Sequence, residues 1–208
     1  MPEARTLVID SASEACSAAL VEGRRVIDFR HEVIGRGHAE RLVPLIAELA
    51  DGGRAEAMAV GCGPGSFAGV RIGVAAARAL ALGWGVPVRG FSTLALVAAG
   101  AADAMAEADG GLVVMEGGHG QWFVQRFAAD LSPRGDVQSL LPDAAIACPD
   151  ALVLGNRAEA FVARRGSGRA LALLPDARDF GRLPAAALFD DPSPIYGRAP
   201  DAKPMAHA

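Results

Sequence analysis

The residues whose types and spacing could do chemistry are Asp10 and a glycine-rich run at residues 61–73. The run reads GCGPGSFAGVRIG and joins a short apolar segment to a long Ala-rich one. Glycines are needed where φ is positive or where a ligand or another backbone comes close. A glycine turn that leads from a strand into a helix N-terminus is also a typical anion site. Asp10, Gly63, Gly65 and Ser66 are therefore the candidates for a nucleotide site.

The established phosphate and nucleophile motifs do not fit this run. A P-loop needs a lysine after its second conserved glycine, and the run has no lysine. A nucleophile elbow needs a glycine where Pro64 stands. The dinucleotide pattern matches at Gly63, Gly65 and Ala68, but no acidic residue for the ribose occurs from residue 57 to 102. We therefore favour a tight strand-to-helix turn, with Ser66 as the N-cap of the helix and Asp10 capping the turn after its strand.

Composition places the chain among globular proteins with a core of small aliphatic residues. It has 208 residues, of which 51% are hydrophobic and 5% aromatic, and a formal net charge of −4, which does not favour autonomous nucleic-acid binding. The three cysteines are isolated, which indicates free thiols in a reducing compartment. Arg78 and two glycines interrupt the longest apolar stretch, residues 72–88. We therefore expect no membrane span and a cytoplasmic protein.

The spacing of apolar residues predicts an α/β protein with two subdomains. Three closely spaced β-runs must pair antiparallel, because parallel pairs need a long crossover. Helices and strands then alternate, and this order is typical of the actin-like ATPase (ribonuclease-H-like) fold. A turn at 109–111 separates an N-terminal subdomain, 1–108, from a smaller one, 109–208, with a mobile tail from about residue 190. The expected elements are strands at 6–9, 16–21, 26–33, 57–62, 86–91, 112–115, 121–127 and 152–154, and helices at 38–50, 67–84, 92–106 and 156–164.

Four segments in the same order resemble the motifs of the TsaB (YeaZ) family. Residues 63–73, GPGSFAGVRIG, closely resemble the family signature GPGSFTGVRIG, with Ala68 in place of its threonine. LVIDSA at 7–12 resembles the family's first strand, HAERLVP at 38–44 its first helix start, and PIYGRAP at 194–200 its C-terminal segment. The hairpin at 116–123 departs from the family pattern, so its role is open.

The resemblance implies an actin-like fold and a non-catalytic scaffold with no cofactor of its own. TsaB proteins are cytoplasmic and support the TsaD enzyme in threonylcarbamoyl transfer to adenosine 37 of tRNAs that read ANN codons. The resemblance implies that the chain forms a heterodimer with TsaD and that TsaE is a further partner. When alone, the chain could instead form a homodimer. We expect it to contact tRNA only through the complex, and ATP or ADP, if either binds, to lie at the interface of the complex. The contact would use the first two helices, with interface residues His38, Leu42, Leu45, Ile46, Arg71, Ala75, Arg78 and Ala79.

Two other classes of function remain open as alternatives. A small ATP-binding enzyme of actin-like fold would use Asp10 and the glycine loop. A metallopeptidase would need an HxxxH helix motif, but the residue four after His38 is Leu42. A metal site needs three or four ligands, so we expect neither a metal site nor catalytic residues.

Overall fold

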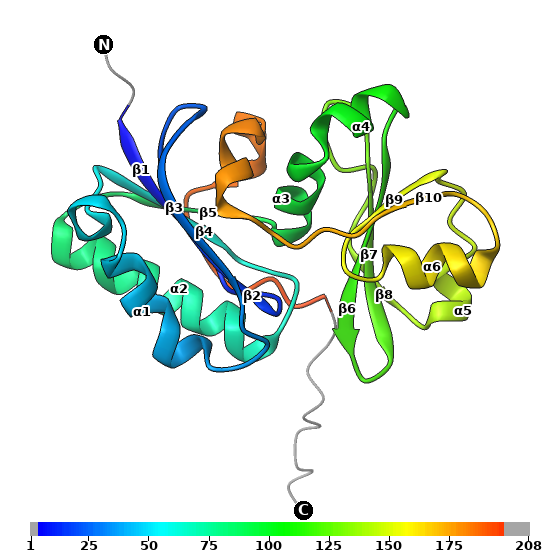
Figure 1. The fold of residues 1–208 in the computed structure, drawn as a ribbon, viewed down its shortest axis with the longest axis horizontal. Helices are drawn as coiled ribbons and strands as arrows, with labels where there is room; N and C mark the ends of the chain where they lie inside the picture. The colour runs from blue at the N-terminus through cyan, green and yellow to red at the C-terminus, as the bar shows by residue number, and fades with distance from the viewer. Residues whose placement is uncertain (1–3, 198–208) are drawn as a thin grey trace, which may run out of the picture.

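Two β-sheets, each covered by helices, form the two lobes of the protein (Figure 1). The computed structural model describes residues 4–197. The first sheet has the strand order β11-β5-β4-β1-β2-β3, and the second has the order β10-β9-β6-β7-β8. The first three strands pair antiparallel, as the sequence predicts, and β1, β4 and β5 are parallel. The strands are β1 Arg5–Asp10, β2 Ala15–Glu22, β3 Arg25–Val33, β4 Ala57–Gly61, β5 Val88–Phe91, β6 Gly111–Gly118, β7 Gln121–Phe127, β8 Gln138–Leu140, β9 Leu152–Leu154, β10 Arg169–Leu171 and β11 Leu188–Phe189.

Helices cover both faces of each sheet. Alternation along β1 sends Leu7 and Ile9 toward α1 and α2 and sends Val8 toward α3 and η2. In the second lobe, Val113 faces the α3 and α4 side, and Val114 faces α5 and α6. The helices are α1 His38–Ala47, α2 Phe67–Trp84, α3 Thr93–Gly100, α4 Ala102–Glu107, α5 Pro142–Ala145 and α6 Ala158–Arg165, with 3-10 turns η1 Ala50–Gly53, η2 Ala177–Arg182 and η3 Ala185–Ala187.

Helix α3 lies between the two lobes (Figure 1). All of its residues except Gly100 are buried, and Leu94 and Val97 pack with the second sheet while Leu96 packs with the first. A helix that is apolar all round must be covered all round. The structure has two helices, α3 and α4, where the sequence predicts one helix at 92–106. The break is at Ala101, whose backbone is not helical (φ −116°, ψ 25°).

The division of the chain differs from the expected boundary at residue 108. Strand β11 returns to the first sheet and pairs antiparallel with β5, with Leu188 opposite Phe91. The Ala177 N–H donates to Ser17 Oγ at 2.9 Å, which fixes η2 against β2. The second sheet is thus inserted between two parts of the first lobe, because the edge of β5 is completed by residues near the end of the chain.

Helix α2 is long and apolar enough to cross a membrane by composition alone. A third of it is buried, against the first sheet. A single helix of this kind is weak evidence for a membrane span, because core helices of soluble proteins pass the same test.

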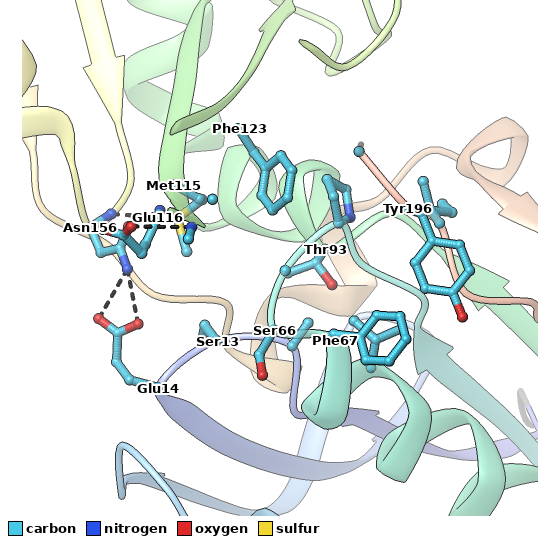
Figure 2. Close-up of a pocket in the computed structure, with 18 of the residues that line it drawn as sticks. Ser13, Glu14, Ser66, Phe67, Thr93, Met115, Glu116, Phe123, Asn156 and Tyr196 are labelled. Carbon is cyan, nitrogen blue, oxygen red and sulfur yellow. Dashed lines mark hydrogen bonds between the residues drawn. The ribbon is translucent and has the colours of Figure 1, made fainter. Parts of the chain in front are cut away.

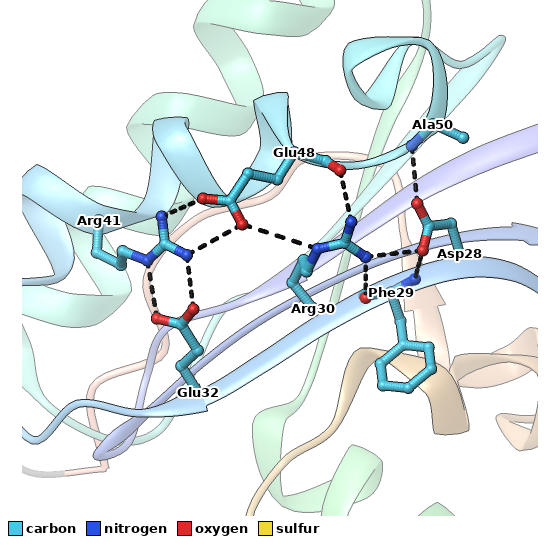
Figure 3. A network of polar contacts seen from close by, with 7 residues as sticks. All are labelled: Asp28, Phe29, Arg30, Glu32, Arg41, Glu48 and Ala50. Atoms are coloured by element: carbon cyan, nitrogen blue, oxygen red, sulfur yellow. Dashed lines mark hydrogen bonds and ion pairs between the residues drawn. The ribbon is translucent and has the colours of Figure 1, made fainter.

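A network of ion pairs ties α1 to the edge strand β3 (Figure 3). Arg41 donates to both oxygens of Glu32 at 2.8 and 2.5 Å, and to Glu48 at 2.6 and 3.2 Å. Arg30 donates to Asp28 and to the carbonyl of Glu48, one of the carbonyls left unpaired where α1 ends. Helix α1 ends at Ala47, three residues before the end of the predicted helix 38–50.

We predict that Arg41→Gln lowers the melting temperature in dilute buffer and has little effect in 1 M NaCl. The guanidinium holds the pKa values of Glu32 and Glu48 below their usual range, so its removal leaves two like charges close together. At high salt these exposed charges are screened. Thermal unfolding followed by circular dichroism checks this, with Arg36→Gln as a matched control that lacks an ion pair within residues 4–197. Equal losses at both salt concentrations would contradict the electrostatic role.

Candidate functional site

The glycine loop between β4 and α2 packs against the turn that follows β1. A Cβ atom on Gly65 would lie 2.1 Å from the carbonyl oxygen of Ala12, and one on Gly69 would lie 2.0 Å from that of Ser11. The Ser66 N–H donates to the Ala12 carbonyl at 2.6 Å, and Ser11 Oγ donates to the Gly69 carbonyl at 2.9 Å. The glycines therefore allow two backbones to touch, which is the packing interpretation of this loop.

Ser66 is the N-cap of α2, as predicted. Its Oγ accepts a hydrogen bond from the Gly69 N–H at 3.3 Å. At the other end, Gly85 adopts a left-handed conformation (φ 69°) and ends the helix. These two signals place α2 at the predicted residues.

Asp10 is buried beneath the loop rather than exposed in a site. Its Oδ1 accepts the Ala12 N–H at 2.9 Å, and its Oδ2 accepts the Thr93 hydroxyl at 2.7 Å. A Cβ on Gly61 would overlap this carboxylate. Burial raises the pKa of Asp10 to about 6, against the opposing effect of these two hydrogen bonds. The carboxylate therefore caps its own turn and holds the start of α3.

A cavity of about 750 Å³ opens between the lobes beside this loop (Figure 2). Gly65 and Ser66 line it, whereas Asp10 and Gly63 do not. On the second-lobe side Asn156 donates to both oxygens of Glu14, at 3.0 and 2.9 Å, so the two lobes touch there. The four predicted nucleotide-site residues are thus split between the cavity wall and the core.

Residues 190–197 form an extended strap along α2 and β5. The Ile195 N–H donates to the Cys62 carbonyl at 2.7 Å, and Tyr196 stacks on Phe67 with ring centroids 5.5 Å apart. The Arg71 guanidinium lies 3.6 Å from the centre of the Phe67 ring, and its Nε donates to the Tyr196 hydroxyl. The predicted tail is therefore docked as far as residue 197, and the rest of it lies outside the described residues.

The predicted partner interface is half buried inside this chain. His38, Leu42, Leu45 and Ile46 are at most 7% exposed, because the apolar stripe of α1 faces its own sheet. The prediction that these four residues contact a partner is wrong, because in the folded chain their side chains are covered by its own sheet. Arg71, Ala75, Arg78 and Ala79 are exposed on α2. Val43, Phe67 and Leu82, which the prediction did not name, are 53%, 58% and 85% exposed, and all three lie off the apolar stripe that periodicity detects.

His38 also shows why the residues do not fit a metal centre. Its Nε2 lies 3.2 Å from the Ala15 carbonyl oxygen, and Leu42 fills the core one turn later. Within residues 4–197 no group of three or more His, Cys, Asp or Glu side chains converges. All three cysteines are free thiols.

Comparisons with known proteins identify the family of this chain. A family model described as TsaD: tRNA N6-adenosine threonylcarbamoyltransferase matches residues 31–171. The chain belongs to this family. Within the family it is similar to proteins named TsaB: it is 44% identical to "tRNA threonylcarbamoyladenosine biosynthesis protein TsaB" of Escherichia coli over 47% of this chain, and 41% identical to that of Haemophilus influenzae over 44%. These matches span only 44% and 41% of the two TsaB relatives.

A solved structure extends the similarity across most of this chain. "YeaZ from Pseudomonas aeruginosa" is 28% identical with a TM-score of 0.75, and the match covers 92% of this chain and 99% of that one. The predicted resemblance to TsaB (YeaZ) and the predicted actin-like α/β fold are both confirmed.

We predict that Gly69→Ala destabilises the fold by about 1–3 kcal/mol, the usual cost of overpacking a core. The new methyl group would collide with the Ser11 carbonyl. Gly83→Ala is the matched control: it lies in the same helix with open space around it, and better helix propensity should add about 0.5–1 kcal/mol. Urea unfolding measures both. Equal effects of the two variants would contradict the close-approach role of Gly69.

We predict that Asp10→Asn flattens the pH dependence of stability. The folded-state pKa of about 6 lies above the unfolded value near 3.8, so the folded wild type holds an extra proton between these values and loses stability as pH rises through them. Relative to the variant, wild type should lose on the order of 2 kcal/mol between about pH 4 and pH 6.5. Urea unfolding across this range measures the difference.

Asp28→Asn is the control for this pH profile. A backbone hydrogen bond from Ala50 holds the pKa of Asp28 below its usual range. Its contribution is therefore lost as pH falls, the opposite sense from Asp10. Parallel profiles for wild type and Asp10→Asn would show that Asp10 is not responsible for the slope.

Proposed function

We propose that the chain is a non-catalytic subunit of tRNA threonylcarbamoyladenosine biosynthesis that binds the TsaD enzyme through the outer face of α1 and α2. The observation that carries this proposal is the apolar character of that face. On α2, Leu82 is 85% exposed and shares a face with the exposed Ala75 and Ala79 by helical spacing, and on α1 Val43 is 53% exposed. Large exposed apolar side chains grouped with small ones are typical of protein interfaces.

The outer side of the helix pair suits contact with other helices. Small side chains on α2 let a partner helix approach closely, and Leu82 and Val43 provide the area that gains most from burial. Arg71 and Arg78 border the face, but both are engaged by the strap: Arg71 by Tyr196, and Arg78 by Asp191 at 2.7 Å. The apolar side chains therefore carry more of the proposed contact than the arginines.

The remaining parts of the proposal come from the TsaB relatives and the family. TsaD is the proposed partner, TsaE joins the complex, tRNA is bound only through it, and the complex works in the cytoplasm. ATP or ADP, if bound, would sit at the interface of the complex. In the absence of TsaD the same face would pair two copies of this chain.

The ATP-enzyme alternative has less support from the site. Asp10 is buried and hydrogen-bonded on both oxygens. The close approach of Gly65 and Gly69 to the turn after β1 accounts for both glycines, so they do not by themselves indicate a phosphate site. The proposed role therefore does not include catalysis by this chain.

We predict that Leu82→Asp and Val43→Asp each weaken association with the TsaD of the same organism at least about 30-fold, as a lost hot spot does. Both side chains are exposed, so the variants should unfold at the wild-type temperature. Leu45→Asp is unsuitable because Leu45 is fully buried. Co-purification with light scattering, followed by calorimetric titration, measures the effect.

Leu141→Asp is the matched control, since Leu141 is 58% exposed and lies in the second lobe. It should bind TsaD as wild type does. Normal binding by both Leu82→Asp and Val43→Asp would contradict the proposed face, and no association of the wild-type chain would contradict the proposed function.

A further inference from the structure

The cavity between the lobes contains a carboxylate without a cationic partner in the described part of the chain. Glu14 lines this cavity, and its side-chain contacts are with the neutral amide of Asn156. Its backbone is fixed, because its carbonyl accepts hydrogen bonds from the N–H groups of Ile34 and Gly35, both at 3.0 Å. A held carboxylate in a cavity is a ready acceptor for a charged donor.

The other charged side chains that line the cavity already have contacts of their own. Glu116 forms an ion pair with Arg157. Arg71 stacks on Phe67 and donates to the Tyr196 hydroxyl. Glu116 is therefore neutralised, and the Arg71 cation lies with the rings of Phe67 and Tyr196. The charge left beside Asn156 is the carboxylate of Glu14, which favours a cation at that side of the cavity.

The rest of the wall is mainly apolar. Phe123 and Met115 come from the second lobe, and Pro64, Val70 and Ile195 from the first lobe and the strap. Figure 2 shows Glu14 and Asn156 on one side of the cavity and the rings of Phe67 and Tyr196 on another. A volume of about 750 Å³ is in the usual range for small-molecule sites.

We propose that the interlobe cavity binds a small organic cation, an amine or guanidinium on an apolar or aromatic body. The cation pairs with Glu14, and Asn156 holds that carboxylate in place. The body lies against Phe123 and the neighbouring apolar wall, where an aromatic ring also attracts a nearby cation. This site does not depend on the proposed function.

The test uses three probes of the same shape and different charge: benzamidine, benzamide and benzoate. Each is titrated into the full chain while backbone amide shifts are followed by NMR. Benzamidine should bind at least about tenfold tighter than benzamide, a difference typical of one charge-assisted contact, and benzoate should bind weakest. Benzamidine should shift the signals of Glu14, Asn156 and Phe123, and its affinity should fall with added salt.

Two variants locate the site. Glu14→Gln should bring benzamidine to within about twofold of benzamide, because the charge contact is removed. Glu40→Gln is the matched control, because Glu40 is exposed on α1; this variant should keep the preference for benzamidine over benzamide. Phe123→Ala should weaken all three probes alike. Equal binding of benzamidine and benzamide to wild type, an unchanged preference in Glu14→Gln, or tighter binding of ATP than of benzamidine would each overturn the proposal.

A further arm identifies the source of the cation. Acetyl-Leu-Arg-Phe-amide presents a guanidinium on a peptide. If it displaces benzamidine at lower concentration than free L-arginine does, the cation comes from a protein side chain; if free L-arginine is as effective, the ligand is a free metabolite. All of these measurements use the isolated chain, so their failure leaves the TsaD-binding experiment unaffected.

Discussion

The contact on which the rest of the structure depends is the approach of the glycine loop to the turn after β1. Carbonyl oxygens of Ser11 and Ala12 occupy the space in which side chains of residues 69 and 65 would lie. Hydrogen bonds in both directions, through Ser66 and Ser11, make the contact specific. With Asp10 beneath it, this junction sets the position of α2 on the sheet, the start of α3 and one wall of the cavity.

The same contact explains the two surfaces for which we propose roles. Because α2 meets the sheet through glycine, alanine and two valines, it buries no side chain larger than valine among its fully buried residues. Its larger apolar residues, Phe67 and Leu82, are left on the outside, near the strap and the α1 face. The glycines of the loop serve its packing against the turn after β1, while the cavity beside the loop stays open.

The sequence predicted correctly those elements that are determined by residues close together in the chain. The N-cap at Ser66 and the left-handed Gly85 defined α2, and β-branched runs defined the first strands. The face of α1 was assigned wrongly, because periodicity identifies an apolar stripe but not what covers it. The Glu14–Asn156 contact and the pairing of β11 join distant residues, and a two-residue strand has no periodicity to detect. The motif PIYGRAP did point to Tyr196, although not to its position against Arg71.

The return of β11 to the first sheet has a consequence for synthesis on the ribosome. The second lobe is one continuous stretch of chain, so it can fold as soon as it emerges. The first sheet cannot gain strand β11 until residue 188 has been made, because Leu188 pairs with Phe91 across almost half of the sequence. During translation the edge of β5 is exposed, and an exposed strand edge can pair with another chain. The fold thus has a period of aggregation risk between the synthesis of β5 and that of β11.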